Sequence, residues 1–333
     1  MKLFLSLLFL SLSLLADSKG FFITVGGING EKDGHKLEGQ YGTIYKTSDL
    51  ADWKEAFKGG PVKDDFNHAK NNLLRCMAYG NGTFVAIGNP KCVIVSKDGE
   101  TWKEVETPHG AFNVAFGNGI FVAGTASNFM TSKDGETWES VRMDKSIPVW
   151  GKEGAGHIRK IVYGNGVFIC YGEQRFGVTK DCKTFIDHKI ITDQSHRASI
   201  ITFGNGKFIW LNPVTGHKIS YDGIKWTPMV INSSDLKEQK GILWTGDKFL
   251  VKAKDLIYSS PDGETWESFK PSFQWCRLTA SGNGKLVSFH GWDSTFFVSE
   301  DGGKTWGQKQ KTDIKARQFY FFNGKEIIGL GGG

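Results

Sequence analysis

Cationic side chains recur at one position of a repeated segment, and cations in this pattern suit the binding of an anion. The sequence contains seven similar segments, most of them ending in a turn with Gly and Asn. When the segments are aligned on these turns, one position carries Arg75, Phe112, Arg159, Ser199, Lys240, Arg277 and Arg317. Five of the seven are cations. A planar guanidinium group matches a carboxylate, sulfate or phosphate. A cation that only hydrogen-bonds the neighbouring segment's carbonyl groups gives the same pattern, so both interpretations stay open.

A second position, two residues earlier, adds polar and aromatic side chains. It carries Leu73, Gly110, His157, Arg197, Glu238, Trp275 and Lys315. We therefore predict one ligand site, formed by Arg75, Arg159, Arg197, Lys240, Arg277, Arg317, His157 and Trp275. Paired carboxylates in the variable segments would suit glycoside hydrolysis, but exposed loop carboxylates are usually only solvated, and we name no catalytic residue. No His pair has ligand spacing, so we expect neither a metal nor a cofactor.

The elements that position these residues are short strands joined by tight turns. Residues 73–102 read as an apolar strand, a Gly-Asn-Gly hairpin, two further strands, a turn and a fourth strand. Asn-Gly between two β-rich runs is the strongest short hairpin signal. The hairpin recurs at 117–119, 164–166, 204–206, 282–284 and 323–324, with a variant at 245–247. Each unit is therefore predicted to be a four-stranded antiparallel meander.

A second turn, Ser/Thr-x-Asp followed four residues later by an aromatic residue, sets the period. Its copies lie at 47–53, 96–102, 132–138, 179–185, 220–226, 260–266 and 299–306, around Asp49, Asp98, Asp134, Asp181, Asp222, Asp262 and Asp301. The hydroxyl and the carboxylate can accept backbone N–H groups inside the turn. Roughly forty residues per four-stranded unit is the blade size of a β-propeller.

Seven turns predict an all-β, seven-bladed β-propeller, with the ring closed by pairing N- and C-terminal strands. The first turn has too few strands before it, and 316–322 is an inner-strand pattern with no turn after it. The closing blade is then split one-plus-three or two-plus-two, with one segment left over. Both turn types should lie on one face of the ring, and the variable segments, which hold all eight histidines, on the other.

The Ser-x-Asp-Gly-x-Thr-Trp copies resemble Asp-boxes, or BNR repeats, of sialidases and related propellers. The layout is also similar to the photosystem II assembly propeller and its bacterial relatives. The resemblance implies that the seven aspartates are structural and lie opposite the binding face. A sialidase-like mechanism would need three arginines, which Arg75, Arg159, Arg277 and Arg317 could supply, but the Arg-Ile-Pro signature of sialidases is absent.

Composition limits the class of protein further. Residues 1–19 contain Lys2 and an apolar run and read as a secretory signal peptide, so 20–333 is expected to be one propeller domain, secreted or periplasmic. The net charge of +6 favours anionic partners weakly and falls short of a nucleic-acid-binding composition. Five cysteines without Cys-x-x-Cys spacing read as buried fillers, although a disulfide stays open.

These observations predict a non-catalytic binding or scaffold module. Its partner would be an anionic glycan or a protein, docked on the face opposite the Asp-boxes. We expect a monomer with no membrane-spanning segment in the mature chain. The alternative is a sialidase-like exo-glycosidase that uses the arginine cluster to hold a substrate carboxylate.

Overall fold

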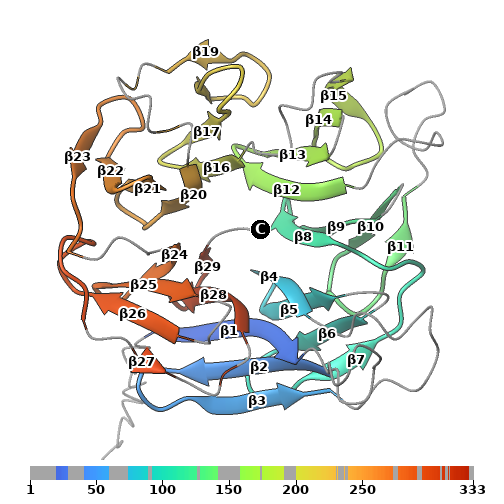
Figure 1. The fold of residues 1–333 in the computed structure, drawn as a ribbon. Coiled ribbons are helices and arrows are strands. Elements are labelled where there is room, and N and C mark those ends of the chain that lie inside the picture. Colours follow the sequence, from blue (N-terminus) through green and yellow to red (C-terminus); the bar gives the residue numbers. More distant parts are fainter. Residues whose placement is uncertain are drawn as a thin grey trace, which may run out of the picture.

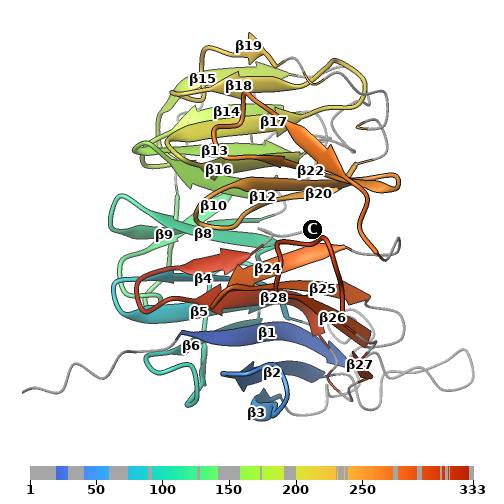
Figure 2. The same cartoon turned by 90° about the vertical axis from the view of Figure 1, so that its left-hand side faces the viewer.

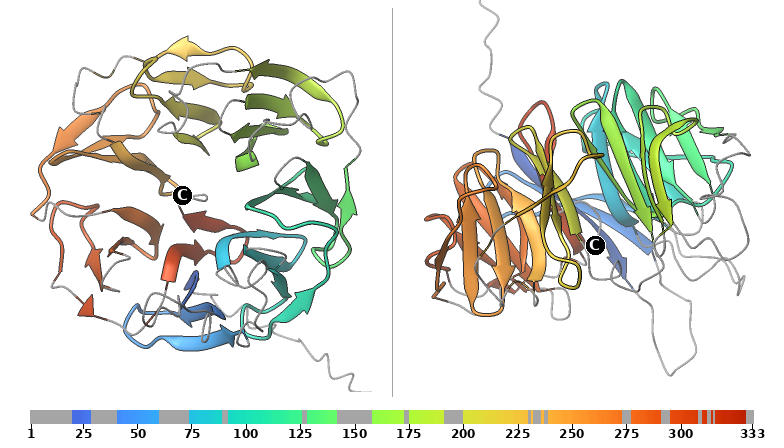
Figure 3. Two further views of the ribbon diagram at one scale, coloured as in Figure 1. Left: turned by 45° about the vertical axis from the view of Figure 1, so that its right-hand side comes forward. Right: turned by 90° about the horizontal axis from the view of Figure 1, so that it is seen from above.

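Antiparallel strands build every sheet of the computed structural model. It describes residues 20–28, 41–59, 74–88, 92–125, 128–141, 158–172, 175–190, 200–229, 231, 236, 239–272, 277–290, 295–307, 310–311, 314 and 316–329. These residues form seven sheets, which we call blades 1 to 7, around a central axis (Figures 1 and 3). The predicted all-β, seven-bladed propeller is confirmed. The predicted signal peptide, 1–19, lies outside the described residues.

The strand bounds follow the repeat. Blade 1 contains β1 (Phe21–Ile28), β2 (Tyr41–Thr47), β3 (Lys54–Lys58), β28 (Ala316–Phe322) and β29 (Ile327–Gly329). Blade 2 contains β4 (Leu74–Gly80), β5 (Thr83–Gly88), β6 (Cys92–Ser96) and β7 (Lys103–Val105). Blade 3 contains β8 (Asn113–Gly117), β9 (Ile120–Gly124), β10 (Phe129–Ser132) and β11 (Glu139–Ser140). Blade 4 contains β12 (Ile158–Gly164), β13 (Val167–Gly172), β14 (Arg175–Thr179) and β15 (Phe185–Ile190).

The last three blades repeat the same order. Blade 5 contains β16 (Ile200–Gly204), β17 (Lys207–Leu211), β18 (Lys218–Ser220) and β19 (Thr227–Pro228). Blade 6 contains β20 (Gln239–Trp244), β21 (Phe249–Ala253), β22 (Leu256–Ser260) and β23 (Glu267–Phe269). Blade 7 contains β24 (Leu278–Gly282), β25 (Lys285–His290), β26 (Thr295–Ser299) and β27 (Gln310–Lys311). The inner strands, β28, β4, β8, β12, β16, β20 and β24, contact one another in turn around the axis.

Blade 1 closes the ring by pairing the two ends of the chain. Strand β1 pairs antiparallel with β28, for example Ile23 with Tyr320, and the two lie side by side in Figure 2. The split is therefore one C-terminal inner strand plus three N-terminal strands. The segment left over is β29, which pairs with the other edge of β28. Blade 1 thus has five strands, and β29 lies inside the ring beside β24 and β20 (Figure 1).

The core lies between blades, because each sheet is covered on both faces by its neighbours. Phenylalanines of the second strands are among the largest fully buried side chains: Phe84, Phe121, Phe168, Phe208 and Phe249. Apolar clusters join successive blades, and one of them joins Ile23 of β1 to Met77 of β4. This packing on two faces explains why the second strands read as continuous apolar runs rather than as alternating patterns.

The Ser/Thr-x-Asp turns, which we call the Asp turns, contain the predicted hydrogen bonds. In the turn at 96–102, the N–H of Gly99 donates to Ser96 Oγ at 2.8 Å. The N–H groups of Glu100 and Thr101 both donate to Asp98 Oδ1 at 2.8 Å. The turn at 299–306 makes the same bonds one residue later, since Gly303 N–H reaches Ser299 Oγ and Thr305 N–H reaches Asp301 Oδ1. One inserted residue is therefore absorbed without loss of the motif.

Hydrogen bonding also explains the acidity of these aspartates. The N–H groups of Ala51 and Asp52 lower the pKa of Asp49 to about 2, and that of Thr265 does most to bring Asp262 to about 2. The pKa of Asp98 is lowered by the N–H of Thr101 in the same way. A carboxyl group with a lowered pKa stabilises the fold above its unfolded pKa and loses that contribution as the pH falls through its folded pKa. The Asp turns therefore weaken only in strong acid.

The hairpin asparagines join each blade to the next. Asn118, with φ 48°, starts a tight turn, and its Nδ2 donates to Gly166 O at 2.9 Å and to Lys180 O at 3.2 Å. Asn81 and Asn165 bond the following blade in the same way. Because Lys180 belongs to an Asp turn, these bonds place the hairpins and the Asp turns on one face of the ring. We call it the hairpin face, and the opposite one the loop face.

Replacing Asn118 by Gly should weaken the contact between blades 3 and 4. The variant keeps a residue that accepts positive φ but removes both donated bonds and the bond that Asn118 Oδ1 accepts from Tyr163 at 2.8 Å. We expect a loss of about 2 kcal/mol of unfolding free energy, measured by urea denaturation. Asn323→Gly is the control, because Asn323 Oδ1 bonds only within its own turn in the described part of the chain. Equal losses in both variants would contradict an inter-blade role.

No described helix is long and apolar enough to cross a membrane. Cys76, Cys92, Cys170 and Cys182 have free thiols, and three of them are fully buried. Burial raises the pKa of Cys76 and of Cys92 to about 12. These thiols behave as small apolar core residues, in agreement with the prediction of buried fillers. Cys276 lies outside the described residues.

Candidate functional site

Five of the eight predicted site residues fall at the loop-face ends of the inner strands. Arg75 lies in β4 and is half-buried, Arg317 lies in β28 and is exposed, and Arg277 directly precedes β24 and is exposed. The backbones of Arg159 and Lys240 lie in β12 and β20, while their side chains are not described. Arg197, His157 and Trp275 lie outside the described residues. The inner-strand register that the sequence predicted therefore places the backbones of five cationic residues near one mouth of the ring.

Four of these cations coincide with a β-bulge. Between the inner and second strands, the register shifts between Leu74 and Cys76 and again between Ile158 and Lys160, so that Arg75 and Arg159 are the extra residues. In the same way Lys240 and Arg317 fall within the shifts of blades 6 and 1. A bulge leaves its extra residue out of the ladder and redirects its side chain.

The other three blades do not repeat this pattern in the described residues. In blade 3 the pairing of β8 with β9 begins at Asn113, directly after Phe112, and the N–H of Phe112 donates to Gly124 O at 2.8 Å. In blade 7 the shift comes two residues after Arg277, between Leu278 and Ala280. Ser199 of blade 5 lies outside the described residues. Four of the five cations at the predicted position therefore coincide with a bulge, which sequence alone did not reveal.

Two cations from distant blades act on each other across the axis. Lys160 follows Arg159 on β12 of blade 4, and its pKa is lowered to about 8, first by burial and then by the charge of Arg277. Arg277 belongs to blade 7, so this effect crosses the ring rather than passing between neighbouring blades. Sequence analysis missed Lys160, although its place next to Arg159 was a usable signal. A bound anion would relieve this repulsion.

Arg75 has a different environment. Its guanidinium carbon lies 5.8 Å from the centre of the Phe112 ring of blade 3. Phe112 is the residue that takes the cation position in that blade, so these two members of the predicted set contact each other. Arg75 therefore helps to join blades 2 and 3 through a cation–π contact. Arg75 therefore supports the second interpretation of the pattern, in which the repeated cation packs on the neighbouring blade and binds no ligand.

Side chains from neighbouring blades complete the hydrogen bonding of the inner strands. The N–H of Met77 donates to the hydroxyl of Tyr320 at 3.2 Å, and that of Ile201 donates to the hydroxyl of Tyr171 at 3.1 Å. Burial raises the pKa of both tyrosines well above the usual range. These residues, Tyr320 on the inner strand β28 and Tyr171 on the second strand β13, were not predicted, because the sequence does not show which blade a buried tyrosine faces. They hold the loop-face ends of the inner strands in place.

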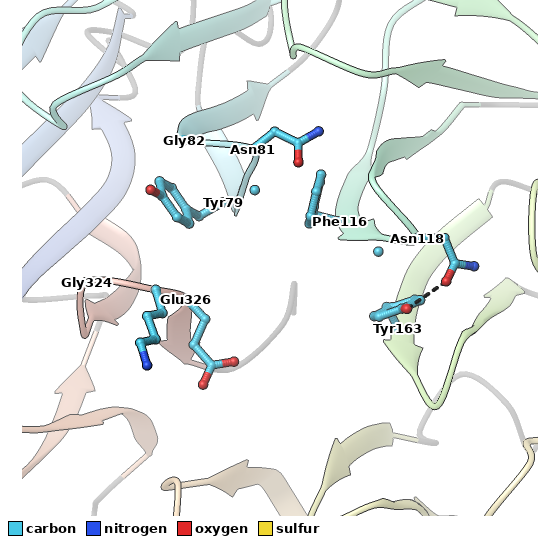
Figure 4. A pocket seen from close by; sticks show the side chains of 11 residues that line it. Tyr79, Asn81, Gly82, Phe116, Asn118, Tyr163, Gly324 and Glu326 are labelled. Carbon is cyan, nitrogen blue, oxygen red and sulfur yellow. Dashed lines mark hydrogen bonds between the residues drawn. The ribbon is translucent and has the colours of Figure 1, made fainter.

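The described pocket lies at the other mouth, on the hairpin face. Its volume is about 630 Å³, and it is lined by Tyr79, Phe116 and Tyr163 at the ends of β4, β8 and β12, and by the turn that holds Lys325 and Glu326. Figure 4 shows the three rings and Glu326 around one opening, with Glu326 across from Tyr163. This pocket was not predicted, because the sequence analysis assigned the hairpin face a structural role only.

Within the described residues, no group of three or more His, Cys, Asp or Glu is arranged to hold a metal ion. Of the eight histidines, the side chains of His109 and His217 are described. Burial lowers the pKa of His217, so its imidazole is mainly neutral at neutral pH. The described residues at the loop-face mouth offer cations and hydrogen-bonding groups around an axis, which suits binding.

Fold and site together define a seven-bladed β-propeller with a cation-bearing mouth. Residues 190–321 match the family model described as the DUF6242 β-propeller domain. The match covers blades 5 to 7 and all of the closing strand β28 except its last residue. No curated protein matches the chain.

Several solved propellers have a similar fold. A structure of YCF48 bound to a D1 peptide has 15% sequence identity and a TM-score of 0.50, with 85% of this chain and 91% of that chain covered. Apo AztD from Citrobacter koseri has 8% identity and a TM-score of 0.56, with 94% and 99% covered. A selenomethionine-substituted virginiamycin B lyase from Staphylococcus aureus has 12% identity and a TM-score of 0.54, with 78% and 94% covered. At these identities the likeness shows the fold alone.

Proposed function

We propose that this chain is an exported, non-catalytic propeller that binds an anionic glycan or an acidic protein surface at the loop face. The proposal depends on one observation above all: Arg75, Arg277 and Arg317 lie at the loop-face ends of three inner strands, and the charge of Arg277 contributes to the lowered pKa of Lys160 on blade 4. Two like charges held together by a rigid scaffold repel each other unless an anion compensates. Arg277 is exposed, so an anion in solution can reach it.

The recurring Asp turns are proposed to be Asp-boxes of the BNR type. Their bonds from backbone N–H groups to an aspartate, and the Trp indoles that donate to turn carbonyls, such as Trp138 Nε1 to Gly135 O at 2.7 Å, support a structural role. Export through the predicted signal peptide at 1–19, to the periplasm or the exterior, belongs to the same proposal. A protein partner is the alternative to a glycan, and the YCF48 neighbour is bound to a D1 peptide.

Retention on immobilised heparin tests the anion site. We expect the mature chain to bind at low salt and elute as salt rises, because screening weakens exposed charge pairs. Arg277→Ala should weaken binding about tenfold. Lys304→Ala is the matched control, since it removes an exposed cation from an Asp turn on the hairpin face. Equal retention of both variants and the wild type would contradict a site at Arg277.

The same variants separate binding from catalysis. A panel of fluorogenic glycosides, sialosides included, should show no turnover with the wild type. Turnover that disappears in Arg277→Ala would instead support the glycosidase alternative. Thermal melting of each variant shows whether the fold is kept, and an Arg277→Ala protein that no longer folds would assign the arginine a structural role.

A further inference from the structure

We propose a second binding site, at the hairpin-face mouth, that takes a neutral oligosaccharide. It is formed by the aromatic rings of Tyr79, Phe116 and Tyr163 together with Lys325 and Glu326. It is independent of the anion site, because it lies at the opposite end of the ring. We call it the hairpin-face pocket.

Among the described residues, β29 lies on one side of the ring's centre, and the pocket lies on the side of blades 2, 3 and 4. Strand β29 lies beside β24 and β20, and Ile328 approaches Gly246 of blade 6. Blades 2, 3 and 4 face the remaining space, which has a volume of about 630 Å³. This is within the usual range for small-molecule sites. The turn before β29 supplies the opposite wall, so the strand that closes blade 1 also shapes the pocket.

The aromatic rings are held rigidly. A Cβ added to Gly80 would lie 2.1 Å from the Phe116 ring, and one added to Gly117 would lie 2.1 Å from the Tyr163 ring. Phe116 and Tyr163 therefore each pack directly on the glycine of the preceding blade, while Tyr79 packs on Phe322 of blade 1, with 4.7 Å between ring centroids. All three residues are partly buried, and their rings border the opening in Figure 4. Rings that are fixed before a ligand arrives lose little entropy on binding.

The polar groups of the pocket balance in charge. Lys325 and Glu326 are exposed and adjacent in the turn, with their N–H groups both bonded to Asn323 Oδ1 at 2.9 Å. Their side chains offer an ammonium donor and a carboxylate acceptor. The Nδ2 groups of Asn81 and Asn118 donate to carbonyl groups of the next blade. Glu326 would repel a strongly anionic ligand, and Lys325 would repel a strongly cationic one.

A sugar meets these conditions. One side of a pyranose ring presents C–H groups, which are attracted to the negative face of an aromatic ring. Its hydroxyl groups donate to a carboxylate and accept from an ammonium group. Three separate rings around the opening allow successive sugar units to contact successive blades. The ligand class is therefore a neutral oligosaccharide rather than the acidic ligand of the loop face.

The experiment is saturation-transfer NMR with oligosaccharides of glucose, galactose, mannose and N-acetylglucosamine at millimolar concentration. We expect binding by the wild-type chain, and about tenfold weaker binding by Glu326→Gln and by Tyr79→Leu. Both variants should keep the fold, since Glu326 is exposed and leucine preserves apolar contact at position 79. Glu267→Gln, an exposed change on the outermost strand β23, is the control and should bind as the wild type does.

Three results would overturn the proposal. The first is no binding of any neutral oligosaccharide in the panel. The second is binding that Glu326→Gln and Tyr79→Leu leave unchanged, which would place the sugar elsewhere. The third is binding of amino acids or peptides in place of sugars. Arg277→Ala should leave sugar binding intact, so failure of the loop-face site and failure of this pocket can be told apart.

Discussion

Replacing Gly117 by Ala is expected to destabilise the propeller by about 3 kcal/mol or more. The added Cβ would lie 2.1 Å from Cδ2 of Tyr163, a distance that van der Waals contact does not allow. Tyr163 cannot retreat easily, because its hydroxyl donates to Asn118 Oδ1 at 2.8 Å and its ring packs on Phe168, with 4.9 Å between centroids. The variant would have to separate blades 3 and 4. Urea denaturation with tryptophan fluorescence measures the loss.

Gly119→Ala, two residues away, is the matched control. Gly119 has φ 76° and no heavy atom within 4 Å of an added Cβ, so this variant carries backbone strain without a clash. We expect a loss of about 1 kcal/mol. The comparison separates the two reasons for a glycine in these hairpins, conformation and space. If Gly119→Ala cost as much as Gly117→Ala, the aromatic–glycine contact between blades would not be the cause.

Replacing Lys160 by Met is expected to stabilise the protein at pH 7 and to change how its stability depends on pH. Burial and Arg277 lower the pKa of Lys160 from 10.5 to about 8. At pH 7 the wild type therefore holds a charged group in an unfavourable place, which by the size of the shift costs about 3 kcal/mol. Methionine has similar length and no charge, so most of this cost disappears.

The sign of the pH effect follows from proton binding. Between pH 8 and 10.5 the unfolded chain keeps the proton on Lys160 that the folded protein has released, so wild-type stability rises with pH in this window. The advantage of Lys160→Met should be largest below pH 8 and vanish near pH 10.5. Buried cysteines and tyrosines titrate in the same range, but they are common to both proteins and cancel in the difference. Urea denaturation of both proteins across this range measures the difference.

A constant difference between the two proteins across this range would contradict the buried-cation interpretation. Sulfate or heparin adds a second measurement, since an anion bound between Lys160 and Arg277 would raise the pKa of Lys160. The advantage of the Met variant at pH 7 should then shrink as the anion is added. Arg277→Ala is the control, because removal of that charge should by itself raise the pKa of Lys160 and stabilise the fold.

The repeat could be predicted from the sequence because its turns depend on hydrogen bonds between nearby residues. The Asp turns and Asn-Gly hairpins depend on residues only a few positions apart, such as Asp98 with the N–H of Thr101. Their spacing therefore predicted the blades, the count of seven, the shared face of both turn types and the pairing of the chain ends. The inner-strand register of Arg75, Arg159 and Arg317 followed from the same counting.

Contacts between blades were decided by tertiary structure, because they join residues that the repeat does not pair. Whether the closing blade was split one-plus-three depended on how β1 and β28 align, and the sequence allowed two answers. The bulges at the cation positions, the approach of Arg277 to Lys160 and the packing of Tyr163 on Gly117 all arise between strands far apart in the chain. Hydrogen bonds between residues close in sequence thus determine the fold of each blade. The volume and charge of side chains from different blades determine the shape and charge of the ring's two mouths.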